Sequence, residues 1–218
     1  MLIDKDTQEI IKFFFKYKII QVNLNEPFKL SSGKTSPVYI DHRYIFSFPQ
    51  LRKKIIEKWS ELIKNSIQDF SSRPLVFAGT ATAGIAPAYA LAEKCDAGFV
   101  YVRGKSKSHG LKSCIEGYFA PNSVFVVVDD MVTTGGSILN AVEKIQELSG
   151  QVILATSISR HDLKNTNYRF SQNALPLKSL FKTTDIFDAA YGMNLIDGKE
   201  MRAIMEWITQ LGEHTEIY

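Results

Sequence analysis

The chain has 218 residues, of which 45% are hydrophobic and 22% charged, and its formal net charge is +3. These values are typical of a globular protein with a sizeable core, and they exclude the dense Lys/Arg stripe of a dedicated nucleic-acid binder. The N-terminus lacks the features of a signal peptide, and no apolar run has the length of a membrane span. We therefore expect a cytoplasmic protein with neither nucleic acid nor membrane as a partner.

Apolar residues at helical spacing predict helices over residues 6–17 and 47–70. The rest of the chain alternates strands with helices. The expected strands are residues 74–79, 98–103, 124–130 and 151–159, and the expected helices are residues 84–94, 136–148 and 198–213. These strands are almost continuously apolar, as in a sheet that helices cover on both faces. The pattern predicts one α/β domain over residues 1–218 with a parallel sheet.

Two adjacent acids, Asp129 and Asp130, end an apolar run, and the turn MVTTGGS follows them. Ligands of open parallel sheets bind beyond the carboxyl ends of the strands, where this turn lies. The N–H groups of the helix that follows attract phosphate, and Gly135 and Gly136 let the backbone approach a ligand closely. The acids repel phosphate but accept hydrogen bonds from sugar hydroxyls or approach a metal ion. The segment therefore predicts a site for a sugar phosphate.

Two other phosphate motifs do not fit this turn. A Walker loop needs GxxxxGK[ST], and the turn has no lysine; a dinucleotide fingerprint needs GxGxxG before the acid and not after it. An acidic N-cap before an ordinary helix is the alternative that involves no ligand.

The stretch VVVDDMVTTGGS resembles the signature of type I phosphoribosyltransferases, which use 5-phosphoribosyl 1-pyrophosphate (PRPP). The resemblance implies a parallel-sheet fold with helices on both faces and a small N-terminal hood, about residues 1–45, over the site. It also implies that Asp129 and Asp130 hold the ribose hydroxyls. The residues implied to bind the 5′-phosphate are Met131, Val132, Thr133, Thr134, Gly135, Gly136 and Ser137.

Four further segments are similar to orotate phosphoribosyltransferases: FKLSSGKTSPVYID, GTATAGIAPAYALA, YVRGKSKSHG and Arg160 after the last apolar strand. By this resemblance Thr82 and Ala83 belong to a pyrophosphate loop. A flexible catalytic loop is implied to bind PRPP through Arg103, Lys105, Lys107 and His109. Catalytic roles are implied for Arg103, Lys107, His109, Asp129 and Asp130, and orotate contacts for Ser31, Tyr39, Ile40, Thr133 and Arg160.

Each of these segments also has a plain structural reading. A cationic loop can stabilise a pyrophosphate leaving group, but a lysine cluster alone is more often a solvated surface loop. GTATAG suits backbone binding of an anion, or close packing of a strand on a helix. Tyr39 could flank a pyrimidine ring or belong to the core. The planar fork of Arg160 matches a carboxylate, which orotate carries.

The resemblance implies the reaction of orotate with PRPP to orotidine 5′-monophosphate and diphosphate, in pyrimidine synthesis. Mg²⁺ is the implied cofactor, bound mainly through PRPP with no direct protein ligand. A homodimer is implied as well, in which the catalytic loop reaches the neighbouring subunit's site. Two alternatives stay open: a phosphoribosyltransferase for another base, and a non-catalytic PRPP-binding regulator.

The chain departs from the family pattern at a few positions. Ser31 and Ala83 stand where many or some members have lysine, Gly104 replaces a lysine, and Ser108 replaces an acid. Four other residues are expected to have no role in the chemistry. We expect His42, His161 and Cys114 at the surface and Cys95 packed, and the two cysteines lack the spacing of a disulfide framework or zinc site.

Overall fold

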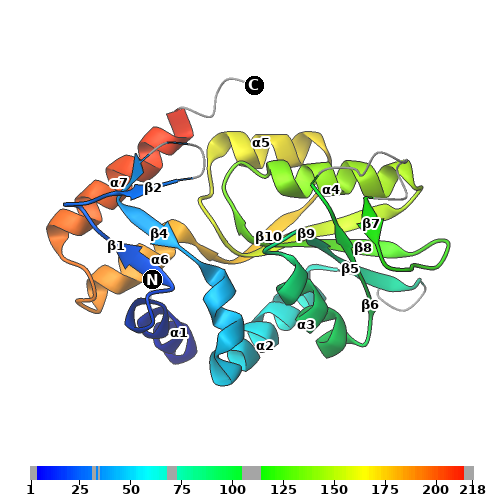
Figure 1. The fold of residues 1–218 in the computed structure, drawn as a ribbon, viewed down its shortest axis with the longest axis horizontal. Coiled ribbons are helices and arrows are strands. Elements are labelled where there is room, and N and C mark those ends of the chain that lie inside the picture. The colour runs from blue at the N-terminus through cyan, green and yellow to red at the C-terminus, as the bar shows by residue number, and fades with distance from the viewer. Residues whose placement is uncertain (1–3, 31–32, 34, 68–72, 105–113, 214–218) are drawn as a thin grey trace.

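The computed structural model describes residues 4–30, 33, 35–67, 73–104 and 114–213 (Figure 1). A six-stranded sheet forms its centre, in the order β10-β9-β8-β5-β6-β7. Neighbouring strands run parallel from β10 to β6, and β7 is antiparallel to β6. The strands are β5 (Leu75–Thr80), β6 (Gly98–Val102), β7 (Ile115–Glu116), β8 (Val124–Val132), β9 (Gln151–Arg160) and β10 (Leu177–Lys182).

Helices cover both faces of this sheet, and each face has its own core. The α-helices of the described residues are α1 (Lys5–Lys16), α2 (Pro49–Ser66), α3 (Ile85–Cys95), α4 (Gly136–Glu147), α5 (Lys164–Gln172), α6 (Thr183–Gly192) and α7 (Gly198–Glu213). Alternate residues of one strand enter opposite cores: Val126 and Val128 of β8 join the core under α2 and α3, whereas Phe125 and Val127 join the core under α4. The continuous apolar runs of these strands follow from burial on both faces.

Helix α2 is anchored to the sheet by a buried tryptophan. Trp59 of α2 is fully buried, and its indole N–H donates to Thr156 Oγ1 of β9 at 2.6 Å. A buried tryptophan needs such a partner for its N–H group. The pair fixes the position of α2 on the sheet and so places the segment that precedes α2 beside the ends of β8 and β9.

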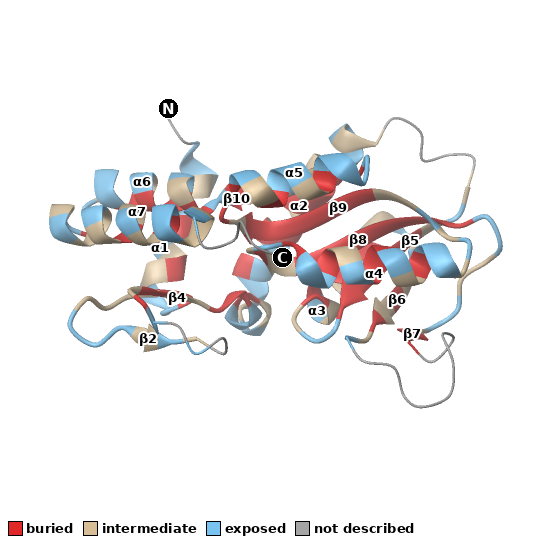
Figure 2. Ribbon diagram, turned by 90° about the horizontal axis from the view of Figure 1, so that it is seen from above, coloured by how far each residue is buried: buried red, intermediate tan, exposed pale blue. Residues whose placement is uncertain are grey.

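The first part of the chain forms two short antiparallel pairs beside the large sheet. β1 (Ile20–Val22) pairs with β4 (Val38–Ile40), and β2 (Phe28–Lys29) pairs with β3 (Thr35–Ser36). They lie with α1, α6 and α7 at one end of the molecule (Figures 1 and 2). A short 3-10 helix, η1 (His42–Ser47), leads from β4 to α2. Whether this end acts as a hood over a bound ligand stays a prediction.

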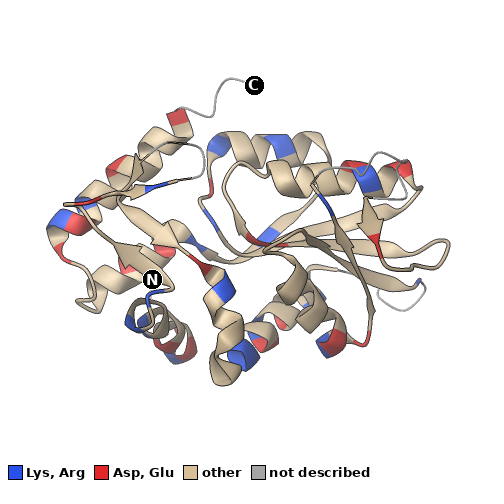
Figure 3. Ribbon diagram, viewed as in Figure 1, with Lys and Arg blue, Asp and Glu red and all other residues tan. Residues whose placement is uncertain are grey.

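Charged residues of both signs are interspersed along the outer helices (Figure 3). Lys54 of α2 pairs with Asp6 of α1 at 3.3 Å and with Glu9, and Lys58 pairs with Asp4 at 3.1 Å. Exposed pairs of this kind contribute at most about 1 kcal/mol each, so they orient α1 more than they stabilise it. None of the helices in the described ranges is long and apolar enough to cross a bilayer.

The predicted fold class is confirmed, and the predicted helices and strands are present with ends that differ by a few residues. The expected helix over residues 47–70 is shorter, because α2 begins at Pro49 and ends at Ser66. Several elements were not predicted, namely β1 to β4, β7, β10, η1, α5 and α6. The short strands have two or three residues, too few for a period to be recognised.

Three surface predictions are wrong. His42 and His161 are buried, because His42 Nε2 lies 2.7 Å from Ser159 Oγ of β9 and the His161 ring packs edge-on against Trp207 of α7. Cys114 is buried as well, and its carbonyl accepts a hydrogen bond from the N–H of Arg103, which extends the pairing of β6 with β7. The fourth prediction, that Cys95 packs against the core, is confirmed. Both cysteines are free thiols.

Candidate active site

Two carboxylates lie at the carboxyl end of β8, a strand flanked by β5 and β9. Asp129 is 8% exposed, and its Oδ1 accepts a hydrogen bond from the backbone N–H of Asp130 at 2.9 Å. Asp130 is half-buried. The five buried residues that precede the pair hold β8 rigidly inside the sheet, so the acids are presented from a fixed position.

The surroundings of this pair disfavour negative charge. Burial, and then the neighbouring charge of Asp130, raise the pKa of the Asp129 carboxyl above its usual range. Burial likewise raises the pKa of Asp130. A ligand that donates hydrogen bonds or carries positive charge relieves this cost. Neighbouring carboxyl groups with a raised pKa are a feature of functional sites.

The turn after the acids encloses a small cavity. We call Asp129 to Ser137 the phosphate turn; together with Ile138 it lines a cavity of about 130 Å³, from which only Asp130 is absent. This volume is below the about 300–1,000 Å³ of a complete small-molecule site, so it suits a single group such as phosphate. Gly135, the N-cap residue of α4, has no side chain that could cap the helix, which leaves the N–H groups of the first turn for a ligand.

Gly135 is required by the shape of this turn. Its φ is +76°, and an added Cβ would lie 2.4 Å from Cε2 of Phe170 in α5. Any other residue would therefore be strained and would collide with a buried ring. The glycine singled out in the sequence thus serves both backbone conformation and close packing.

The connection between β5 and α3, which contains Thr82 and Ala83, packs against β8 next to the acids. A Cβ on Gly84 would lie 2.4 Å from the carbonyl oxygen of Val128, so glycine allows the two segments to touch. Thr82 is exposed, and the peptide bond between Ala81 and Thr82 is cis. Close strand–helix packing is therefore real here, and it brings the predicted pyrophosphate segment beside the carboxylates.

Arg103, at the end of β6, already has partners. Its Nη1 lies 3.2 Å from Glu116 Oε1, and its carbonyl accepts a hydrogen bond from Lys144 Nζ of α4 at 2.7 Å. Lys144 also donates to the Gly104 carbonyl at 3.2 Å. Lys105, Lys107 and His109, predicted as further loop cations, lie outside the described residues.

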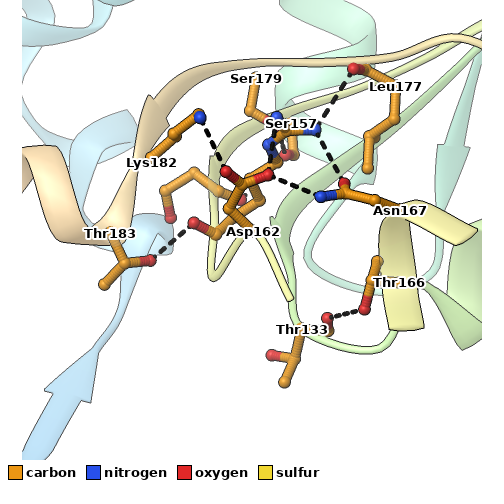
Figure 4. A network of polar contacts seen from close by, with 11 residues as sticks. Thr133, Ser157, Asp162, Thr166, Asn167, Leu177, Ser179, Lys182 and Thr183 are labelled. Atoms are coloured by element: carbon orange, nitrogen blue, oxygen red, sulfur yellow. Dashed lines mark hydrogen bonds and ion pairs between the residues drawn. The ribbon is translucent and has the colours of Figure 1, made fainter. Parts of the chain in front are cut away.

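Arg160 ends β9 and is held in a polar network that we call the arginine cluster, made of Arg160, Asp162, Asn167 and Lys182. Figure 4 labels the last three of these residues. Its Nη2 lies 2.9 Å from Asp162 Oδ1, and Lys182 Nζ lies 2.7 Å from the other oxygen of that carboxylate. Asn167 also donates to Asp162, at 3.0 Å. The sequence did not indicate this internal counter-ion, which any anionic ligand of Arg160 has to share or displace.

The remaining predicted orotate residues come from the N-terminal end. Tyr39 and Ile40 lie on β4 and are half-buried, and the Tyr39 ring lies 5.6 Å from the Phe28 ring. Ser31 lies outside the described residues. Thr133 belongs to the phosphate turn, so the predicted orotate contacts arise from β4, β9 and the turn.

Arg43 is a residue of this region that sequence reasoning missed. Its guanidinium makes two hydrogen bonds with Asp41, at 2.7 and 2.6 Å. The Asp41 carboxylate, followed by smaller effects of Tyr39 and Asp130, raises the pKa of Arg43 above its usual value. A positive charge therefore acts on Asp130 from η1. The only signal in the sequence was an arginine two residues after an acid at the end of a short strand.

Comparison with known proteins identifies the family to which this site belongs. The phosphoribosyl transferase domain family matches residues 50–171, more than half of the chain. An orotate phosphoribosyltransferase of Staphylococcus saprophyticus is 34% identical over 198 residues, which cover 91% of this chain and 96% of that protein. The chain belongs to the orotate phosphoribosyltransferase family.

Other members of the orotate phosphoribosyltransferase family are similar to this chain in sequence and fold. The one from Coxiella burnetii is 33% identical and covers 91% of this chain and 93% of its own length. The solved structure of the Aeropyrum pernix enzyme has a TM-score of 0.70 at 26% identity, covering 86% of this chain and 99% of that one. A Mycobacterium tuberculosis member in complex with PRPP shares the fold, with a TM-score of 0.62 at 22% identity over 83% of this chain and 98% of that one. The predicted family and transferase class are confirmed.

Proposed function

We propose that this protein transfers the 5-phosphoribosyl group of PRPP to N1 of orotate, which gives orotidine 5′-monophosphate and pyrophosphate in pyrimidine synthesis. One observation carries this proposal: a buried acid and a half-buried acid are followed, after a short turn, by the N-terminus of α4 with a glycine N-cap, around a phosphate-sized cavity. The 34% identity to an orotate phosphoribosyltransferase over 91% of the chain supports the choice of base.

The phosphate turn would bind the two ends of the ribose 5-phosphate. Asp129 and Asp130 accept hydrogen bonds from the ribose hydroxyls, which relieves the cost of their burial. Backbone N–H groups and hydroxyls from Met131 to Ser137 bind the 5′-phosphate. Because β8 and α4 hold both halves, the sugar ring is fixed relative to the incoming base.

The reaction needs no covalent enzyme intermediate. The bond between ribose C1 and pyrophosphate breaks with its electron pair going to the pyrophosphate oxygen. N1 of orotate forms the new bond from the opposite face, and the N1 proton is released to water. The segment with Thr82 and Ala83 and the cations Arg103, Lys105, Lys107 and His109 would stabilise the leaving group. Release of Arg103 from Glu116 would be part of this role.

Mg²⁺ would neutralise charge on the pyrophosphate oxygens. The residues present fit a metal held mainly by substrate, because β8 offers two adjacent carboxylates at its end. Asp129 and Asp130 are the carboxylates that could reach the ion or its waters, and Mg²⁺ is usually bound by one or two carboxylates plus substrate phosphates.

Orotate would lie between the end of β9 and the N-terminal hood. Arg160 would pair with its carboxylate or imide edge while Asp162 keeps the guanidinium oriented. Tyr39, Ile40, Ser31 and Thr133 would complete the base site. We further propose a cytoplasmic homodimer of single-domain subunits, in which the loop carrying Lys105 and Lys107 completes the neighbouring site.

The decisive experiment follows the absorbance of orotate after PRPP and Mg²⁺ are added to the purified protein. We expect a PRPP-dependent loss of orotate absorbance that added pyrophosphate reverses. If PRPP binds in calorimetry but orotate is never consumed, the function is that of a regulator or of a phosphoribosyltransferase for another base. Omission of Mg²⁺ is the control for the proposed cofactor.

A further inference from the structure

Helix α5 contacts three successive residues of the phosphate turn. Thr166 Oγ1 donates to the carbonyl oxygen of Thr133 at 2.7 Å, as Figure 4 shows. One turn further along α5, Arg169 Nη1 donates to the carbonyl oxygen of Thr134 at 2.9 Å. The ring of Phe170 fills the space that a side chain at position 135 would occupy. No part of α5 belongs to the segments that indicated PRPP binding.

These contacts determine which way the peptide groups of the turn face. In a planar trans peptide, the carbonyl and the N–H of the next residue point in opposite directions. With the carbonyls of Thr133 and Thr134 directed at α5, the N–H groups of Thr134 and Gly135 point away from it. Residues of this stretch line the small cavity, so donors are presented to an anion before it arrives.

The surroundings of the contacts make them effective. Thr166 is 3% exposed and Phe170 is 2% exposed, so the bond to the half-buried Thr133 comes from a buried donor, whereas the Arg169 bond to Thr134 lies at the surface. The Arg169 guanidinium adds positive charge behind the turn, which favours an anion in front of it. A carbonyl that lost its donor would no longer be held toward α5, and its peptide would be free to rotate.

We propose that Thr166 and Arg169 of α5 are positioning residues that hold the phosphate turn in its anion-binding geometry. They act through the backbone carbonyls of Thr133 and Thr134 and touch no substrate. This inference rests on the proposed function, because it assigns the turn to the 5′-phosphate of PRPP. It predicts that α5 controls affinity for PRPP selectively, without altering affinity for the base.

The test is Thr166→Val, which keeps the β-branched shape and removes only the hydroxyl donor. Since a hydrogen bond contributes about 0.5–1.5 kcal/mol, we expect PRPP to bind about fivefold more weakly in calorimetry, with an equal rise in its KM. Inhibition by inorganic phosphate should weaken by a similar factor. The KM for orotate and the kcat at saturating PRPP should change by less than about twofold. Thr166→Ser, which restores a hydroxyl, should recover PRPP affinity.

Arg169→Gln is a second test of the proposal, and Thr209→Val is the control. Arg169→Gln removes the charge and should weaken PRPP binding at least as much as Thr166→Val, which keeps the proposal testable if the valine variant fails to fold. Thr209→Val makes the same substitution on α7, where it removes an exposed bond within the helix from Thr209 Oγ1 to the Met205 carbonyl at 2.9 Å, and it should leave both KM values unchanged.

Unchanged PRPP affinity in both α5 variants would overturn the proposal. So would equal losses for PRPP and orotate, or a lower kcat with unchanged KM values, because those results describe a general loss of folded protein. Failure of the proposed function is a different result: the wild-type protein would then bind no PRPP or consume no orotate.

Discussion

The phosphate turn and the arginine cluster lie at the ends of the neighbouring strands β8 and β9, yet they prepare for their ligands differently. The turn is one continuous segment whose binding groups are mostly backbone N–H groups, oriented by α5. The cluster joins side chains from three parts of the chain and contains its own counter-ion, Asp162. Uncharged backbone N–H groups without a ligand cost little free energy. A half-buried guanidinium without a counter-ion costs much more, so it is paired even when no ligand is bound.

The acids of the phosphate turn and two buried histidines, His42 and His161, contribute to stability with opposite dependence on pH. Burial raises the pKa of Asp129 and Asp130, so the stability that their protonated forms favour is lost as pH rises above about 4. Near the end of β9, burial lowers the pKa of His42 from 6.5 to about 3 and that of His161 from 6.5 to about 4. Neutral histidine stabilises the fold above the unfolded value, and this contribution is lost as pH falls toward the folded values.

The largest effect is expected at the acids of the phosphate turn. Asp130→Asn should lower kcat/KM by about 100-fold, because hydrogen bonds to a charged acceptor contribute about 1.5–3 kcal/mol. The same variant should have a higher Tm than the wild type at about pH 8, since a buried negative charge has been removed, and the difference should shrink toward about pH 4. Steady-state assays and thermal unfolding measure the two quantities.

Asp129→Asn is the matched variant, and it should behave alike in both measurements. A loss of activity together with a lower Tm at about pH 8 would mean that the carboxylates hold the fold together and are not reserved for a ligand.

An intermediate effect is expected at the arginine cluster. Arg160→Ala should weaken orotate binding by about 30-fold, because a charge-assisted pair with its carboxylate is lost. PRPP affinity should change by less than about twofold, since the turn is held by separate contacts. Isothermal calorimetry with each ligand measures both affinities.

Arg160→Lys keeps the charge but not the planar fork, and should recover only part of the orotate affinity. Equal losses for orotate and PRPP in Arg160→Ala would mean that the two regions are not independent. In that case the assignment of Arg160 to the base would fail.

The smallest effect is expected for the buried histidines. As pH falls from about 6.5, the unfolding free energy should decrease by up to about 1.4 kcal/mol per pH unit for each of them, because the unfolded chain binds the protons. Urea unfolding at several pH values measures this slope. His42→Gln should make it shallower, and an unchanged slope would show that the His42 ring is protonated within the fold.

The sequence alone determined the features that are contiguous in the chain. The acids after the apolar run, the glycine-containing turn and the helix after it were predicted together, because a strand, a turn and a helix in succession place their residues side by side. The long apolar strands likewise indicated a parallel sheet covered on both faces. Helix α5 was missed because its sequence, KNTNYRFSQ, has too few apolar residues to show a period.

Only the tertiary structure decided which side chains meet across the fold. His42 contacts Ser159, 117 positions away, and Thr166 contacts Thr133, 33 positions away. Nothing in the local sequence around these residues indicates that they are partners. The counter-ion of Arg160 was not foreseen either: Asp162 is only two residues further along the chain, but its other oxygen is held by Lys182 of β10. Local order follows from propensity and periodicity. Which polar group becomes buried, and what satisfies it, depends on how distant elements pack.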